Sequence, residues 1–284
     1  MKSLYRFFII VVTIFFISGC TGEKPLPNEA LQEEPRDTAE LQSTENPTGY
    51  SEVEIEKLLS ENSITPLLYY SVGNPPEINV SESQIIWKQN DIVFAADLSK
   101  SEGEQVYESD TVISKMHIES NQGSYTISLD KKPLRINSLS LSSVNYLAIH
   151  VGDHEGSRLI IVDLTTGSQV NINELYEEGV EAVNAYNWSP DGKQLACAIG
   201  NLGSSFLALY DAEKKSLKIV SDEDYESIYA VAWHRDGFGL DFISQKGDSE
   251  EALLRYREDS IKEVMKLDRS NRQMILDTIP VTVK

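Results

Sequence analysis

Short apolar segments alternate with polar turns along most of the chain after residue 66. Each segment is bounded by glycine, proline, asparagine or aspartate, which is the pattern of β-strands joined by tight turns. The stretch from Trp188 to Ala198 shows this pattern most fully. Its first strand ends at Trp188, Pro190 presets φ for a turn, and Gly192 supplies the positive φ that closes it. A second apolar strand follows directly, so this stretch predicts a β-hairpin.

The same unit recurs at Trp233, 45 positions after Trp188, and an Asp-Gly pair follows both tryptophans. A third, weaker copy lies on the other side, where Tyr146–Ile149 matches Gln194–Cys197 at an offset of 48. Repeats of about 40 to 50 residues are typical of β-propeller blades. We therefore predict an all-β, propeller-like domain with about four recognisable four-stranded blades.

The blades are expected at about residues 84–129, 134–173, 180–221 and 225–266. After the last blade, apolar residues at 274–276 and 279–283 predict one or two terminal strands. Three arrangements agree with this pattern. The terminal strands could supply a fifth blade, the ring could be small, or the propeller could be incomplete.

A short helix is predicted ahead of the blades, from Glu52 to Ser60. Ser51 and Glu54 have the spacing of a capping box. An apolar stripe at helical spacing follows, formed by Ile55, Leu58 and Leu59. We expect this stripe to pack on the domain, and a helix that binds a partner is the alternative.

The first 20 residues have the pattern of an export signal. Lys2 and Arg6 form a basic start, and the apolar run at 7–17 is too short to span a bilayer. The run ends in Ile17-Ser18-Gly19-Cys20, which resembles the lipobox of bacterial lipoproteins. The resemblance implies that residues 1–19 are cleaved as a signal peptide and that Cys20 becomes the N-terminus, carrying acyl chains such as palmitate. An ordinary secretory signal with a chance cysteine is the alternative.

Residues 20–50 are rich in proline and polar residues and nearly free of large apolar ones. We expect a disordered tether there, with the short helix and the propeller-like domain in residues 51–284. Cleavage after residue 19 would leave 23 basic and 45 acidic residues, a formal net charge of −22. Such a surface repels phosphate backbones, which argues against nucleic acid as a partner.

Few residues are placed for chemistry. Asp153-His154-Glu155 lies near His150 and could bind a divalent cation, but a solvated loop is the simpler interpretation. Ser221–Asp224 lacks the ligand spacing and the central glycine of a calcium loop. Cys197 stands in a predicted strand and is expected to be a buried, inert thiol. With no nucleophile elbow and no nucleotide-binding fingerprint, we assign no catalytic, metal or cofactor site, and only Cys20 as a modification site.

The segment Trp188–Ala196, with the aliphatic strand that ends in Tyr210-Asp211, resembles the TolB-type β-propeller repeat. Trp188 is expected to pack between blades, and Asp191 to accept hydrogen bonds from the turn. The fourth blade departs from the pattern, because His234-Arg235 replaces the Ser-Pro pair. The resemblance implies a ring of six or more blades, whereas four are recognisable here.

From these features we expect a non-enzymatic, lipid-anchored protein on the extracytoplasmic face of a bacterial cell membrane. Its TolB-like propeller would bind a protein or peptide at the cell envelope, since propeller loops converge on one face and a lipid with a tether raises the local concentration. Two alternatives remain. One is a lipoprotein that binds a small molecule, sugar or cation in the propeller channel. The other is a hydrolase of wall polysaccharide with paired carboxylates.

Overall fold

The computed structural model describes residues 52–71, 74–100, 111–176, 179–221, 224–247 and 250–280. They belong to a compact unit of residues 45–284. The predicted signal peptide, the tether and Cys20 lie outside the described residues.

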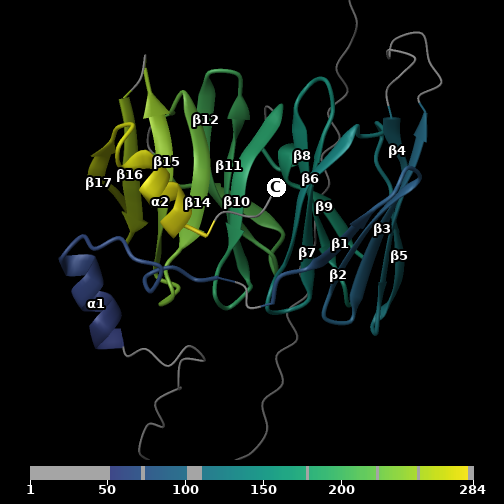
Figure 1. Cartoon of the computed structure of the whole chain (residues 1–284), viewed down its shortest axis with the longest axis horizontal. Coiled ribbons are helices and arrows are strands. Elements are labelled where there is room, and N and C mark those ends of the chain that lie inside the picture. Colours follow the sequence, from purple (N-terminus) through teal and green to yellow (C-terminus); the bar gives the residue numbers. More distant parts are fainter. Residues whose placement is uncertain are drawn as a thin grey trace, which may run out of the picture. The chain divides into compact units, whose positions relative to one another are not determined.

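Within the described ranges, seventeen strands form four antiparallel sheets, and each sheet is built from strands that follow one another along the chain (Figure 1). The first sheet contains β1 (Glu77–Val80), β2 (Gln84–Gln89), β3 (Ile92–Lys100), β4 (Thr111–Ser120) and β5 (Gly123–Ile127). The second contains β6 (Arg135–Leu141), β7 (Tyr146–Gly152), β8 (Ser157–Asp163) and β9 (Gln169–Asn171), followed by the 3-10 turn η1 (Ile172–Glu174). The third contains β10 (Ala182–Trp188), β11 (Gln194–Asn201), β12 (Ser204–Asp211) and β13 (Ser216–Ile219). The fourth contains β14 (Ser227–Trp233), β15 (Gly239–Lys246), β16 (Glu250–Arg257) and β17 (Ser260–Leu267).

The predicted blades are confirmed. The four sheets fall inside the four expected ranges, apart from β1, which precedes the first range, and the last residue of β17, Leu267, which lies one position beyond the fourth. Each sheet is an up-and-down meander, so neighbouring strands pair in chain order. The domain is therefore all-β and propeller-like. β1, which gives the first sheet one strand more than the other sheets, was not predicted.

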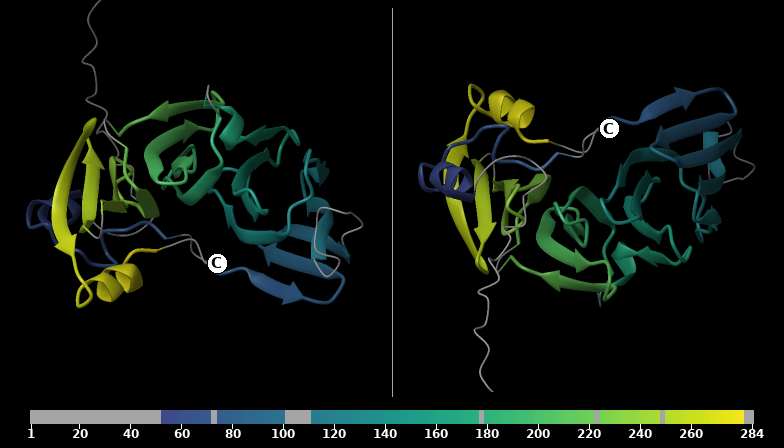
Figure 2. Two further views of the ribbon diagram at one scale, coloured as in Figure 1. Left: turned by 90° about the horizontal axis from the view of Figure 1, so that it is seen from above. Right: turned by 90° about the horizontal axis from the view of Figure 1, so that it is seen from below.

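The sheets pack face to face in chain order, and the three interfaces are hydrophobic cores (Figure 2). Burial along the strands follows from this packing. In β11, six consecutive residues from Leu195 to Gly200 are buried, because both faces of its sheet are covered. In β3, Ile92, Phe94 and Ala96 are buried while the residues between them are only half-buried. The first sheet therefore buries one of its faces in the core with the second sheet, and its other face is open to solvent.

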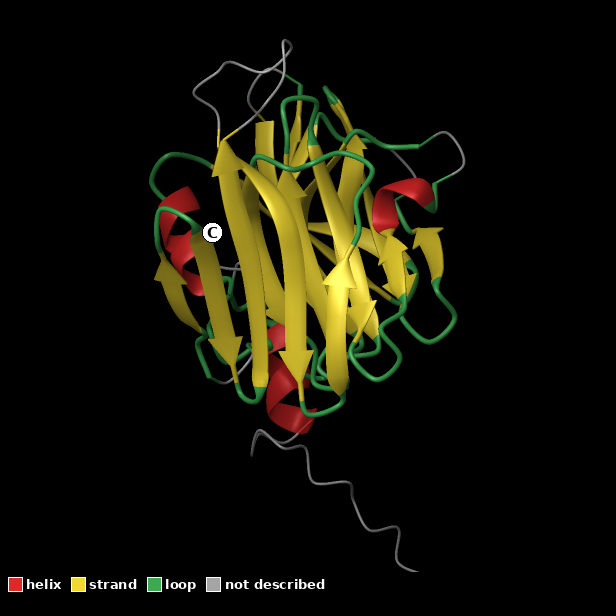
Figure 3. Ribbon diagram, turned by 90° about the vertical axis from the view of Figure 1, so that its right-hand side faces the viewer, coloured by secondary structure: helices red, strands yellow, loops and turns green. Residues whose placement is uncertain are grey.

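The far face of the fourth sheet is covered by segments from the two ends of the described chain. From the first end, α1 (Glu52–Ser60) packs Ile55 against this face, and Tyr69 follows it in the chain. From the other end, α2 (Arg272–Thr278) packs Ile275 against the same face. Figure 3 draws the helical segments in red, and they lie at the margins of the strands. The predicted helix and its packing on the domain are confirmed. Among the described residues, no hydrophobic cluster joins the fourth sheet to the first, which is the arrangement of an incomplete propeller.

The strand predicted at 274–276 is wrong, because Met274–Leu276 lies inside α2. Most of the strand predicted at 279–283 lies outside the described residues. The apolar residues that face the core are Ile275 and Ile279, four positions apart, whereas Met274 is 56% exposed. A spacing of four places both residues on one face of a helix, and so few apolar residues do not distinguish a strand from a helix by pattern alone.

Candidate functional site

The repeated turns are structural, as predicted. Trp188 and Trp233 are buried, and each indole Nε1 donates to a carbonyl in the first strand of the preceding sheet, at 3.2 Å to Ser140 and 3.1 Å to Asn187. Each tryptophan thus anchors one sheet to the next. Gly192 adopts the predicted positive φ, at 70°.

Asp191 and Asp236 close their turns in the same way. Asp191 Oδ1 accepts hydrogen bonds from the Lys193 backbone N–H at 3.1 Å and from Ser189 Oγ at 2.6 Å. Asp236 Oδ1 accepts the Phe238 backbone N–H at 2.9 Å. These carboxylates are used within the turns, which is the role expected for Asp191.

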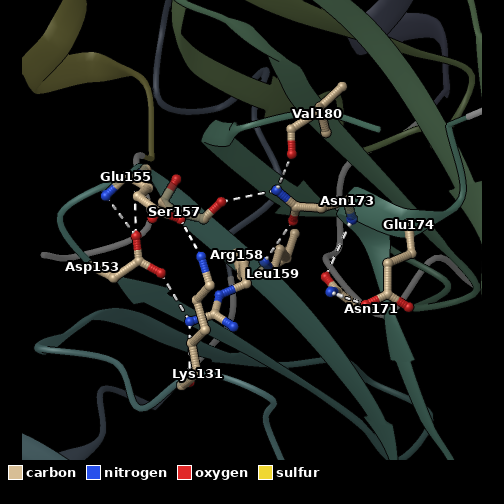
Figure 4. Close-up of polar contacts among 11 residues, drawn as sticks. Lys131, Asp153, Glu155, Ser157, Arg158, Leu159, Asn171, Asn173, Glu174 and Val180 are labelled. Atoms are coloured by element: carbon tan, nitrogen blue, oxygen red, sulfur yellow. Dashed lines mark hydrogen bonds and ion pairs between the residues drawn. The ribbon is translucent and has the colours of Figure 1, made fainter. Parts of the chain in front are cut away.

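The loop Asp153-His154-Glu155 is held by protein groups rather than arranged around a cation (Figure 4). Asp153 Oδ1 accepts the backbone N–H groups of Glu155 and Gly156, and its Oδ2 accepts Arg158 Nη2 at 2.9 Å. Glu155 pairs with Lys131. Within the described ranges, no group of three or more His, Cys, Asp or Glu side chains could hold a metal ion.

The same region ties the second sheet to the third. Ser157 Oγ donates to the Val183 carbonyl at 2.8 Å and accepts the Val183 N–H at 3.1 Å. Asn173 in η1 accepts the Leu159 N–H and donates to the carbonyls of Ser157 and Val180 (Figure 4). In the next sheet, Ser221 Oγ accepts the Leu207 N–H in the same position. The acidic stretch 221–224 thus begins with a structural serine, and Asp222 and Glu223 lie outside the described residues.

Cys197 lies fully buried in the core between the second and third sheets. Burial raises the pKa of its thiol to about 12, so the thiolate is nearly absent at neutral pH. The expectation of an inert thiol agrees with this environment. None of the described helices is long and apolar enough to cross a membrane.

A set of residues that the sequence did not reveal lies on the first strands of three sheets. The strands β6, β10 and β14 each form an edge of their sheet, and each carries a register shift at the same position relative to its neighbour. The residues at the shifts are Asn137, Asn184 and Tyr229, which we call the bulged edge. A β-bulge redirects a side chain and occurs often beside functional sites.

Asn137 belongs to a polar group contributed by the second and third sheets. Its Oδ1 accepts Arg135 Nε at 2.9 Å, and its Nδ2 lies 3.4 Å from His150 Nε2. The His150 ring meets Tyr186 edge-on, with ring centroids 5.8 Å apart. His150, which the sequence had associated with the Asp153 loop, therefore belongs to this group.

The other two members of the bulged edge differ in how far they are covered. Asn184 is exposed, and its Nδ2 is 3.5 Å from Ser205 Oγ. Tyr229 donates to Glu251 Oε2 at 2.7 Å and lies beneath the guanidinium of Arg272, 5.2 Å from the ring centroid. Burial, and then the hydrogen bond to Glu251, raise the pKa of Tyr229 to about 12. Asn184 is thus the member most open to a partner, and an amide offers both a donor and an acceptor to a peptide backbone.

A buried ionic cluster holds the fourth sheet to the chain segment that covers it. Asp241 is fully buried and accepts Arg255 Nε at 2.8 Å, Arg255 Nη2 at 3.0 Å and Tyr69 Oη at 2.9 Å. His234 Nε2 lies 2.9 Å from the same carboxylate. Burial alone raises the pKa of Asp241, but the hydrogen bonds from Arg255 and His234 outweigh it and hold the pKa below its usual value. Burial, and then the Asp241 charge, raise the pKa of Tyr69 strongly.

A signal for this cluster was present in the repeat. Asp241 pairs across the strands with Arg255, whereas the corresponding pairs in the other sheets are Ala196 with Leu209 and Ala148 with Ile161. Those two pairs carry no charge. The charged pair of Asp241 and Arg255 lies beside Tyr69, in the segment that covers the fourth sheet.

Models of protein families match no part of the sequence, and a comparison with curated proteins also finds no match. Among solved structures, the chain is similar to a putative TolB from Agrobacterium tumefaciens (12% identity, TM-score 0.40, 68% of this chain and 80% of that one). It is also similar to TolB from Acinetobacter baumannii (12%, 0.39, 66% and 41%) and to the β-propeller domain of the Trilobed protease from Pyrococcus furiosus (11%, 0.41, 66% and 59%). The chain thus spans less than two thirds of the last two. The fold assignment rests on the strand order and the repeated turns described above.

The prediction that the protein is not an enzyme is overturned by the same comparison. The similar structures include the tricorn protease, a puromycin hydrolase and prolyl endopeptidases, at identities of 11–15% and TM-scores of 0.34–0.38. The chain covers 22–32% of those proteins. The missing nucleophile motif does not decide the class of this protein.

Proposed function

We propose that this chain is a lipid-anchored protein on the extracytoplasmic face of a bacterial membrane and that its propeller-like domain binds a protein or peptide through the bulged edge. The observation that carries the binding proposal is the same register shift in three successive sheets, at Asn137, Asn184 and Tyr229. Such a repeated shift places polar side chains along the edge strands of three sheets. Edges of this kind, with amide and aromatic side chains, suit recognition of a polypeptide.

The anchoring part of the proposal is supported by the leader sequence, in which a basic start and an apolar run precede Ile17-Ser18-Gly19-Cys20. Growth with a labelled fatty acid should mark the wild-type chain and a Cys197→Ser variant equally. The Cys20→Ser variant should carry no label. Equal labelling of the Cys20→Ser variant would contradict the anchor.

The binding part can be tested by cross-linking in intact cells. A photo-reactive amino acid placed at Asn184 should yield an adduct with a second protein. The same group at Lys262, an exposed residue on β17, is the matched control and should not yield this adduct. No adduct from position 184, or the same adduct from both positions, would contradict binding at the bulged edge.

A further inference from the structure

The first sheet has a strand without a counterpart in the other sheets. β1 precedes β2, the strand that leads into the first repeated turn, and β2 is its only partner among the strands of the described residues (Figure 1). All four of its residues are exposed, including Ile78 at 55% and Val80 at 71%. Apolar β-branched side chains at such exposure on an edge strand are unusual, because unprotected edges invite pairing with another chain.

The register shows which backbone groups of β1 are available. Ser81 donates its N–H to the Gln84 carbonyl at 2.9 Å, so these two residues face each other as a hydrogen-bonding pair. Hydrogen-bonding and non-hydrogen-bonding pairs alternate along an antiparallel ladder. The pairs Val80–Ile85 and Ile78–Trp87 are therefore non-hydrogen-bonding. Ile78 and Val80 thus direct their N–H and C=O groups away from β2, toward the open edge.

The side chains at this edge complete a surface for an added strand. Ile78 and Val80 stand on the same face as their partners Trp87 and Ile85. Within β1 there is no lysine, proline or bulge, which are three of the devices that protect an edge. A strand laid beside β1 would gain backbone hydrogen bonds at two residues and cover two apolar side chains.

We propose that β1 binds an extended, basic segment of a partner protein by strand addition. This inference rests on the proposed function, that the domain binds a protein or peptide, and it adds a second contact, at β1, and the chemistry of the segment bound there. Glu77 and Glu82 are exposed at the two ends of β1, and the chain has a formal net charge of −20. Basic residues flanking the segment would be attracted to both. A second copy of this chain would carry the same charge and be repelled, and four residues bury too little area for a stable dimer.

A fluorescent peptide of alternating valine and threonine, with two lysines at each end, is a direct probe of this edge. Fluorescence anisotropy should show binding to the full chain, and binding of the same peptide with glutamates in place of the lysines should be at least tenfold weaker. Exchange of the Ile78 and Val80 amide protons should slow on binding, because only their N–H groups face the added strand.

The matched variants at position 78 separate the backbone from the side chain. Ile78→Pro removes an outward N–H that the β1–β2 ladder does not use, so the fold should be kept and binding should weaken at least tenfold. Ile78→Val keeps the N–H and should bind within about twofold of wild type. Val80→Pro tests the second outward N–H in the same way.

Three results would overturn strand addition at β1. They are the absence of peptide binding, equal binding by wild type and both proline variants, and a concentration-dependent dimer that Ile78→Pro abolishes, which would identify a second copy as the occupant. If cross-linking from Asn184 is observed while the peptide does not bind the wild-type chain, the proposed function stands and this inference falls.

Discussion

The pairing of Asp241 with Arg255 gives the sharpest quantitative prediction. Removing one member of a buried ion pair usually costs about 3–5 kcal/mol, because the remaining charge is left without a partner. Asp241→Ala should reach this range, since Arg255, His234 and Tyr69 all contact the same carboxylate. Arg255→Leu should cost a similar amount, because it leaves the carboxylate buried without its main counter-charge.

The double variant Asp241→Ala/Arg255→Leu restores the kind of pair that the third sheet has at Ala196 and Leu209. Replacing a buried ion pair by apolar residues is often nearly neutral. We therefore expect the free energy of unfolding of the double variant to be no lower than that of either single variant. This requires a coupling energy between the two positions of about 3 kcal/mol or more, which is the upper end of the range for residues in direct contact. If the two single costs simply added, they would approach the whole stability of a typical domain, about 5–15 kcal/mol.

Urea unfolding followed by tryptophan fluorescence measures all four free energies of this cycle. The matched control is Lys214→Ala, which removes a solvent-exposed ion pair with Asp211 and should leave the free energy of unfolding close to that of the wild type. A wild-type midpoint for Asp241→Ala, or single costs that add in the double variant, would refute the reasoning.

Three further predictions follow from the described contacts. Gly192→Ala should lower the melting temperature more than Gly237→Ala. Both sites have positive φ, but a Cβ at Gly192 would clash with Ser143 Oγ at 2.5 Å, whereas a Cβ at Gly237 would only touch Pro190 at 3.8 Å; equal losses would contradict this. Native Cys197 should resist a thiol reagent that labels it fully in urea, and rapid native labelling would be the contrary result. Because the native pKa of Asp241 is lowered, the stability that its charge contributes should be present above pH ~4, the usual aspartate pKa, and lost as the pH falls toward the native pKa. Asp241→Asn should flatten this fall of the unfolding free energy at acid pH, and an unchanged fall would exclude the cluster as its cause.

The repeated turns could be predicted because their chemistry is local. Tryptophan, proline, aspartate and glycine specify a hairpin within six residues, so the blades followed from Trp188 and Trp233. The packing role of each indole also followed from its place at a strand end. The segments that cover the fourth sheet could not be identified in this way. The spacing of Ile275 and Ile279 indicates a helix only when the core that both residues face is known.

The bulged edge and the ionic cluster could not be predicted for a different reason. A bulge is a property of the register between two strands, and one residue more or less in a strand leaves its apolar pattern nearly unchanged. Asp241 and Tyr69 are 172 positions apart, and nothing local marks them as partners. Comparison of the Asp241–Arg255 pair with the uncharged pair of the third sheet would have indicated an unusual environment at Asp241. It would not have identified Tyr69 as a further partner.

Binding at the bulged edge is tested most directly by hydrogen exchange of the chain with and without the partner identified by cross-linking. We expect slower exchange in the segments that carry Asn137, Asn184 and Tyr229, on β6, β10 and β14, and no change in the outermost strands β9, β13 and β17. Protection confined to the outermost strands, or no protection in β10, would contradict the account.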